Sequence, residues 1–112
     1  MYVAGALFAE NAWEITKNIH RAAAVGFEVA KLGASPIIPH TNTGSVFMGT
    51  LFTAFWYEAT LELLRRCDAV ILVPGWESSK GVAAEIQEAD RLHLPVFHNV
   101  YKLQRWLSGD GT

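Results

Sequence analysis

Short apolar runs alternate along the chain with longer segments whose apolar residues recur at helical spacing. Residues 69–73 form a continuous apolar run, which is typical of a strand covered on both faces of a sheet. In residues 11–32, Ile15 and Val29 fall near one face of a helix, and Gly33 supplies a stop signal. The expected strands are residues 2–5, 37–38, 69–73 and 96–98, and the expected helices are residues 11–32, 52–66, 82–93 and 101–107.

This alternation predicts an α/β fold with a parallel sheet, helices on both faces and right-handed crossovers. In such folds, ligands bind beyond the carboxyl ends of the strands. Glycine, Asn, Ser, His and aromatic residues are concentrated in the segments that follow the expected strands, which are residues 5–11, 39–49, 74–80 and 99–101. We therefore expect the functional site at this edge of the sheet.

A carboxylate interrupts the apolar face of the helix expected at residues 82–93. At about 100° per residue, Val82, Ile86, Ala89 and Leu92 share an arc of about 120°, and Glu85 falls inside it. Burying an unpaired carboxylate is costly, so Glu85 needs a partner or a function.

The residues before Glu85 favour a ligand site. Ser79 is expected to cap the helix start, where free backbone N–H groups can bind an anion or a hydroxyl group. Gly81 precedes Glu85 by four residues and leaves space on the same helix face. The alternative is a capped helix with a tolerated glycine and a Glu85 held in a salt bridge at the edge of the core.

Composition narrows the class of protein. The 112 residues are expected to form one domain, residues 1–112, and a net charge of −2 without a basic block argues against binding to duplex nucleic acid. Cys67 is the single cysteine, the four histidines are scattered, and no glycine-rich nucleotide motif is present. We expect no metal, no cofactor, no membrane span and a cytoplasmic location.

Aromatic residues raise two further expectations. Phe55, Trp56 and Tyr57 lie in an aromatic segment, residues 47–57, that is expected to form a subunit interface, with core packing as the alternative. Side chains near the strand ends could contact a flat ligand or, for Tyr2, pack in the core; these are Tyr2, Phe8, His40 and Trp76.

Several segments together resemble the nucleoside 2-deoxyribosyltransferase-like superfamily. They are Tyr2-Val3-Ala4-Gly5, Pro39-His40, Cys67-Asp68-Ala69 and, above all, residues 75–85, GWESSKGVAAE. Within the superfamily the chain is most similar to small phage and bacterial proteins with a P-G-W-x-x-S-x-G-x-x-x-E signature. The resemblance implies a flavodoxin-like three-layer sandwich with a parallel sheet of four to five strands, with the expected strands in the order 2-1-3-4.

The resemblance also implies chemistry. Glu85 matches the nucleophile that attacks the anomeric carbon of a nucleoside, and Tyr2 matches the aromatic residue that contacts it. Thr60 stands where active relatives carry an aspartate that protonates the leaving base, so Glu58 or another subunit would have to supply that proton. Residues expected to bind substrate are Gly5, Phe8, His40, Asn42, Trp76, Ser79, Gly81 and Asn99.

Two functions remain open. One is cleavage or transfer of the N-glycosidic bond of 2′-deoxynucleosides or nucleoside 5′-monophosphates, through a covalent glycosyl-glutamate. The other is a non-catalytic nucleotide-binding module of the same fold. The resemblance implies a small-molecule nucleoside or nucleotide as ligand and a homodimer or higher homo-oligomer, in which a neighbouring subunit completes the pocket.

Overall fold

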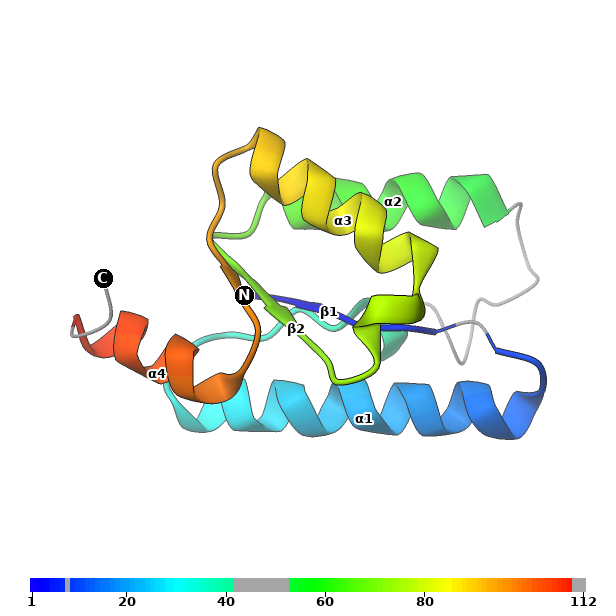
Figure 1. Ribbon diagram of the computed structural model, residues 1–112, viewed down its shortest axis with the longest axis horizontal. Helices are drawn as coiled ribbons and strands as arrows, with labels where there is room; N and C mark the ends of the chain where they lie inside the picture. Colours follow the sequence, from blue (N-terminus) through cyan, green and yellow to red (C-terminus); the bar gives the residue numbers. More distant parts are fainter. Residues whose placement is uncertain (8, 42–52, 110–112) are drawn as a thin grey trace.

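The computed structural model describes residues 1–7, 9–41 and 53–109. Strands and helices alternate along these ranges, except that no strand separates the first two helices (Figure 1). The elements are β1 (Tyr2–Ala4), α1 (Ala12–Lys31), α2 (Thr53–Arg65), β2 (Val70–Leu72), the short 3-10 helix η2 (Trp76–Ser78), α3 (Lys80–Arg91), β3 (Val96–Phe97) and α4 (Val100–Ser108).

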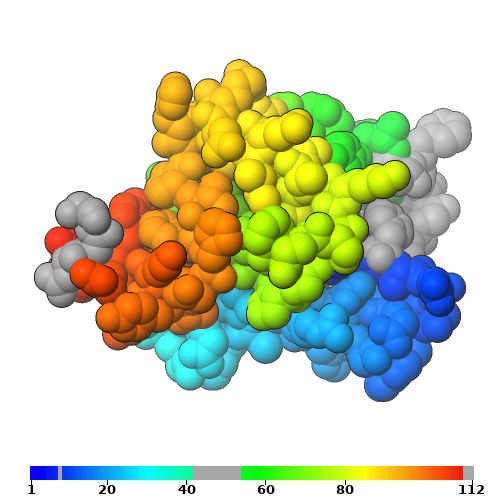
Figure 2. Space-filling view, in the orientation of Figure 1, coloured from blue at the N-terminus to red at the C-terminus, as the bar shows by residue number. Residues whose placement is uncertain are grey.

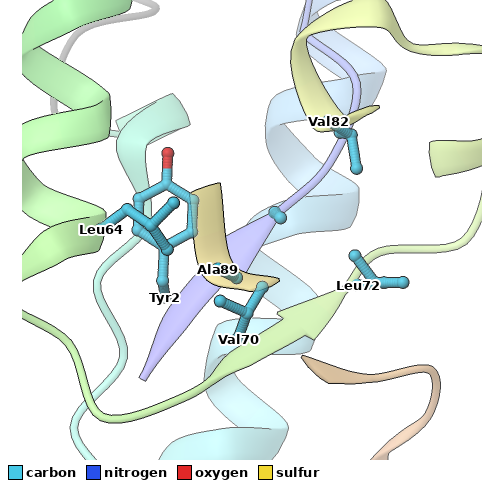
Figure 3. Close-up of a cluster of buried hydrophobic side chains, with 7 residues drawn as sticks. Tyr2, Leu64, Val70, Leu72, Val82 and Ala89 are labelled. Carbon is cyan, nitrogen blue, oxygen red and sulfur yellow. The ribbon is translucent and has the colours of Figure 1, made fainter. Parts of the chain in front are cut away.

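The sheet lies between two helical layers, with α2 and α3 on one face and α1 and α4 on the other (Figure 1). Because successive strand residues point to opposite faces, each strand contributes to both layers. The first core contains Tyr2, Ala4, Leu64, Val70, Leu72, Val82 and Ala89 (Figure 3). The second core contains Val3, Ala22, Val29, Ile71, Val73 and Leu103. This double burial explains the continuous apolar run at residues 69–73.

The sheet has three parallel strands in the order β1-β2-β3, and not the four to five strands expected. The segment expected as a strand at residues 37–38 is reduced to one parallel bridge between Ile37 and Tyr2. Ile37 donates its N–H to the carbonyl of Met1 at 2.8 Å and accepts from the N–H of Val3 at 2.9 Å. The neighbour relations of the expected order 2-1-3-4 are nevertheless retained, with Ile37 beside β1 and β1 beside β2.

Proline explains why the pairing stops at one residue. Residues 35, 37 and 39 face β1, and Pro39 has no N–H group to donate to the carbonyl of Val3. The pairing therefore stops after Ile37, whereas before it the amino group of Met1 still donates to the carbonyl of Ser35 at 3.1 Å.

Side-chain caps fix where the helices begin. Asn11 accepts a hydrogen bond from the backbone N–H of Glu14 at 2.9 Å and starts α1. Ser79 accepts from the N–H of Val82 at 3.2 Å, so α3 begins at Lys80, two residues earlier than expected. Within the described ranges, no helix has both the length and the apolar character needed to cross a membrane.

A close approach between two segments requires glycine after β1. A Cβ atom added to Gly5 would lie 2.7 Å from the Cβ of Val73, which follows β2. We therefore predict that Gly5→Ala lowers the free energy of unfolding by about 1–3 kcal/mol through overpacking. Urea unfolding at neutral pH measures this change.

Gly81→Ala is the matched control for that substitution. A Cβ atom on Gly81 would lie 3.7 Å from Oγ of Ser79 and 3.8 Å from Cε2 of Tyr57, which is ordinary van der Waals contact. Alanine in a helix should leave stability unchanged or raise it by up to about 1 kcal/mol. Equal stability of Gly5→Ala and the wild type would contradict the packing argument.

Candidate functional site

The first turns of α3 place Glu85 against the side chain of Tyr2, at the end of β1. The hydroxyl of Tyr2 donates a hydrogen bond to Oε2 of Glu85. Tyr2 is fully buried, and its ring packs beside Leu64 with the hydroxyl directed away from the apolar cluster (Figure 3). Within the described ranges, Glu85 has no ion-pair partner, so the salt bridge considered from the sequence is not formed there. The hydrogen bond from the Tyr2 phenol replaces that salt bridge.

Burial controls the charge of this pair. Removal from water raises the pKa of Glu85 to about 7, although the hydrogen bond from Tyr2 acts in the opposite direction. The pKa of Tyr2 is raised above its ordinary value, first by burial and then by the negative charge of Glu85. Glu85 therefore changes charge near neutral pH, while Tyr2 stays protonated as its hydrogen-bond donor.

Helix α2 places Thr60 near the pair. The Thr60 hydroxyl group lowers the pKa of the Tyr2 phenol, against the larger effect of burial. Thr60 also donates its hydroxyl proton to the carbonyl of Tyr57 at 2.9 Å. The position that matches the aspartate of active relatives therefore lies in the site, but it carries a hydroxyl group.

Sequence reasoning assigned Tyr57 to a subunit interface and missed its place beside Glu85. Its Cε2 atom is 3.8 Å from the point where a Cβ on Gly81 would lie. The pKa of Tyr57 is raised by burial and then by the charge of Glu85. The available signal was spacing, because Tyr57 and Thr60 are three residues apart and so share one face of α2.

The loop between β2 and α3 leads directly into the helix that carries Glu85. In the space-filling view it lies at the surface between α3 and α1 (Figure 2). Ser79 and Gly81 form the start of α3, one turn from Glu85. Trp76 is half-buried against the first core and meets the ring of His98 edge-on at 5.6 Å. Its ring is thus engaged in packing as well as being close to the site.

His40 supports the turn that follows β1. It is only 3% exposed, and its Nε2 lies 3.0 Å from the carbonyl oxygens of both Gly5 and Ala6. Since carbonyl oxygens only accept, Nε2 carries the hydrogen. Burial lowers the pKa of His40, which keeps the ring neutral, and Nδ1 has no hydrogen-bond partner among the described residues.

Other expected site residues are not brought to Glu85. The side chain of Glu58 is 65% exposed and forms an ion pair with Arg65 at 3.0 Å. Arg65 also forms an ion pair with Glu88 on α3. Asn99 is exposed and caps α4 by accepting from the N–H of Lys102 at 2.9 Å. The expected contacts of Phe8 and Asn42 lie outside the described residues.

A cavity of about 290 Å³ lies on the α1 side of the same sheet edge. The cavity opens where β1 and β2 end. The next segment of the chain, Ile37, lies on one side of β1, and the following strand β2 lies on the other, so the strand order reverses here. Ligands commonly bind at such a topological switch point. The residues that line the cavity are Ala6, Ala9, Glu14, Asn18, Arg21, Val73, Pro74, Gly75 and Ser78. Among the described residues, no group of three or more His, Cys, Asp or Glu side chains could hold a metal ion.

The buried carboxylate predicts a pH-dependent stability difference between the wild type and Glu85→Gln. Below about pH 4.5 the carboxyl group is protonated in both the folded and the unfolded chain. As the pH rises toward 7 the unfolded chain ionises first, so the folded wild type loses stability. Each pKa unit corresponds to about 1.4 kcal/mol, so the stability of Glu85→Gln relative to the wild type should rise by roughly 2–3 kcal/mol between pH 5 and pH 8.

Urea unfolding of both proteins at pH 5 and pH 8 measures this difference. Glu77→Gln, at an exposed position on η2, is the matched control and should show a much smaller change. A stability difference that stays constant between the two pH values would contradict the assignment of a buried, ionisable Glu85.

The comparisons with known proteins give one match, to a family described as "Domain of unknown function (DUF4406)", over residues 1–98. No curated protein and no solved structure matches the chain. The matched residues include β1, β2, α3 and every described member of the site around Glu85. Because the match spans most of the sequence, the chain belongs to the DUF4406 family.

Proposed function

We propose that the protein cleaves or transfers the N-glycosidic bond of 2′-deoxynucleosides or nucleoside 5′-monophosphates through a covalent glycosyl ester on Glu85. The observation that carries the proposal is the buried Glu85 carboxylate, which accepts a hydrogen bond from the hydroxyl of Tyr2, the first residue of β1. The resemblance of residues 75–85 to the nucleoside 2-deoxyribosyltransferase-like superfamily supports the choice of substrate.

The chemistry follows from what a carboxylate does beneath a sugar ring. In the first step, an oxygen of Glu85 attacks the anomeric carbon and the C–N bond breaks, with the electron pair leaving on the base. In the second step, water or another base attacks the same carbon and releases Glu85. The transition state carries positive charge on the sugar, so an anion held nearby in a partly dry site stabilises it.

The remaining residues have supporting roles in this proposal. Tyr2 holds the reactive oxygen of Glu85 in place, and its hydrogen bond limits the rise in the pKa of Glu85. The start of α3 at Ser79 and Gly81 offers backbone N–H groups to the sugar or its 5′-phosphate. Gly81 leaves the face of α3 one turn before Glu85 without a side chain, and the Tyr57 ring lies across it at a distance that a methyl group would fill.

A second candidate is a nucleotide-binding module without catalysis. Thr60 provides no carboxylic acid where active relatives carry aspartate, and Glu58 is held by Arg65. If no other group protonates the base, the pocket would bind nucleotides without cleaving them.

Release of free base distinguishes the two candidates. We predict that the wild type releases base from at least one member of a panel of deoxynucleosides and their 5′-monophosphates, followed by chromatography. Glu85→Gln should abolish release, because an amide is nearly isosteric but a poor nucleophile. Since the carboxylate is the reactive form, kcat/KM should fall as the pH is lowered through about 7.

Three outcomes would go against the enzymatic proposal. Glu85→Gln with most of the wild-type rate would remove Glu85 from the mechanism. A rate that rises as the pH falls below 7 would make the protonated carboxyl group the active form. Nucleotide binding by calorimetry, without release of base from any substrate, would favour the binding module.

We further propose that the protein is a homo-oligomer that uses the aromatic segment defined above. Residues 42–52 lie outside the described residues, but α2 shows the end of the segment. Phe55 is 52% exposed and its ring meets that of Trp56 edge-on, which leaves an aromatic surface beside the site. Exposed aromatic groups of this kind are enriched in interfaces.

Sedimentation velocity at micromolar concentration tests this assembly. We predict a dimer or larger species for the wild type and a shift toward monomer for Phe55→Lys. Tyr101→Lys, at an aromatic on α4 that is more exposed than Phe55, is the control and should leave the assembly unchanged. A 12.4 kDa monomer for the wild type would end the proposal.

A further inference from the structure

We propose that Tyr57 is a further catalytic residue of the Glu85 site and donates its phenolic proton to the departing base. The inference rests on the proposed function. It addresses the group that this function lacks, since Thr60 is no acid and Glu58 is bound by Arg65.

The position of Tyr57 is the first argument. Its ring lies 3.8 Å from the point where a Cβ on Gly81 would be, one helical turn before Glu85. A ligand that approaches Glu85 from the side of Gly81 would therefore contact the Tyr57 ring. Tyr57 is 39% exposed, whereas Tyr2 is fully buried, so Tyr57 is the tyrosine that a bound base can reach.

The anchoring of Tyr57 is the second argument. Its backbone carbonyl accepts from the hydroxyl of Thr60 at 2.9 Å, and the same Thr60 side chain lies near enough to Tyr2 to lower the pKa of its phenol. Thr60 therefore holds the Tyr57 backbone close to the Tyr2–Glu85 pair. Its own hydroxyl makes no hydrogen bond within the described ranges, so that O–H remains available to a ligand.

Electrostatics gives the proton transfer a direction. While Glu85 is an anion, its charge and burial raise the pKa of Tyr57 and keep the phenol protonated. Formation of the glycosyl ester removes that charge. The phenol therefore becomes a stronger acid as the base departs, which is when the proton is needed.

Atoms and charges balance over the two steps. In the first, a Glu85 oxygen bonds to the anomeric carbon, the C–N bond breaks, and the base nitrogen takes the phenolic proton and leaves Tyr57 as phenolate. In the second, the phenolate removes a proton from the attacking water or base, the ester bond breaks, and Glu85 returns to a carboxylate. No oxidant, reductant or metal is required.

Leaving-group dependence tests the assignment. The rates of wild type and Tyr57→Phe are compared on the natural deoxynucleoside that the wild type cleaves best and on 4-nitrophenyl 2-deoxyriboside, whose leaving group needs no proton. Where the wild type requires a 5′-phosphate, both substrates carry it. Tyr101→Phe, which removes an exposed hydroxyl from α4, is the matched control.

We expect Tyr57→Phe to reduce kcat on the natural substrate by about 10²–10⁴-fold, the usual contribution of a general acid. Its rate on the nitrophenyl substrate should stay near that of the wild type, which also shows that the variant is folded with Glu85 intact. Equal loss on both substrates, or no loss on either, would overturn the role of Tyr57 while leaving Glu85 catalysis in place. A wild type that cleaves neither substrate would overturn the proposed function, and the proton transfer with it.

Discussion

The hydrogen bond from Tyr2 to Glu85 is the interaction on which the rest of the site depends. It allows a carboxylate to occupy the inner face of α3, where Val82 and Ala89 are buried on either side. Without a donor, a carboxylate at this depth would remain protonated or would force α3 away from the sheet. The bond also fixes α3 relative to β1, since the donor is part of the first strand and the acceptor part of the third helix.

The elements around this bond each contribute one requirement of the site. Strand β1 supplies the donor, α3 supplies the carboxylate, and α2 supplies the hydroxyl groups of Thr60 and Tyr57. His40 holds the turn after β1 through the carbonyl oxygens of Gly5 and Ala6, and the cavity on the α1 side lies at the same edge of the sheet. The parallel sheet brings these segments together, because the ends of β1 and β2 meet at one edge.

Local pattern explains what could be predicted. Helical spacing placed Glu85 on an apolar face, and capping rules identified Ser79; both features depend only on residues within or next to one helix. The neighbour relations of the sheet were likewise predictable, but Pro39 limits the expected strand at 37–38 to one bridge. Contacts between α2 and α3 could not be predicted, because the residue pattern of each helix does not specify its rotation relative to the other helix. Tyr57 was therefore missed, and Glu58 was assigned to a site that it does not reach.

Trapping the covalent intermediate tests the central claim most directly. A fluorine atom at the 2-position of the sugar destabilises the positively charged transition state and slows release of the ester. Incubation with a 2-fluoro-2-deoxyarabinosyl nucleoside, followed by intact and peptide mass spectrometry, would locate the attached sugar. The account predicts one sugar per chain, on Glu85, and none on Glu85→Gln. Base release without any adduct, or an adduct on another residue, would contradict it.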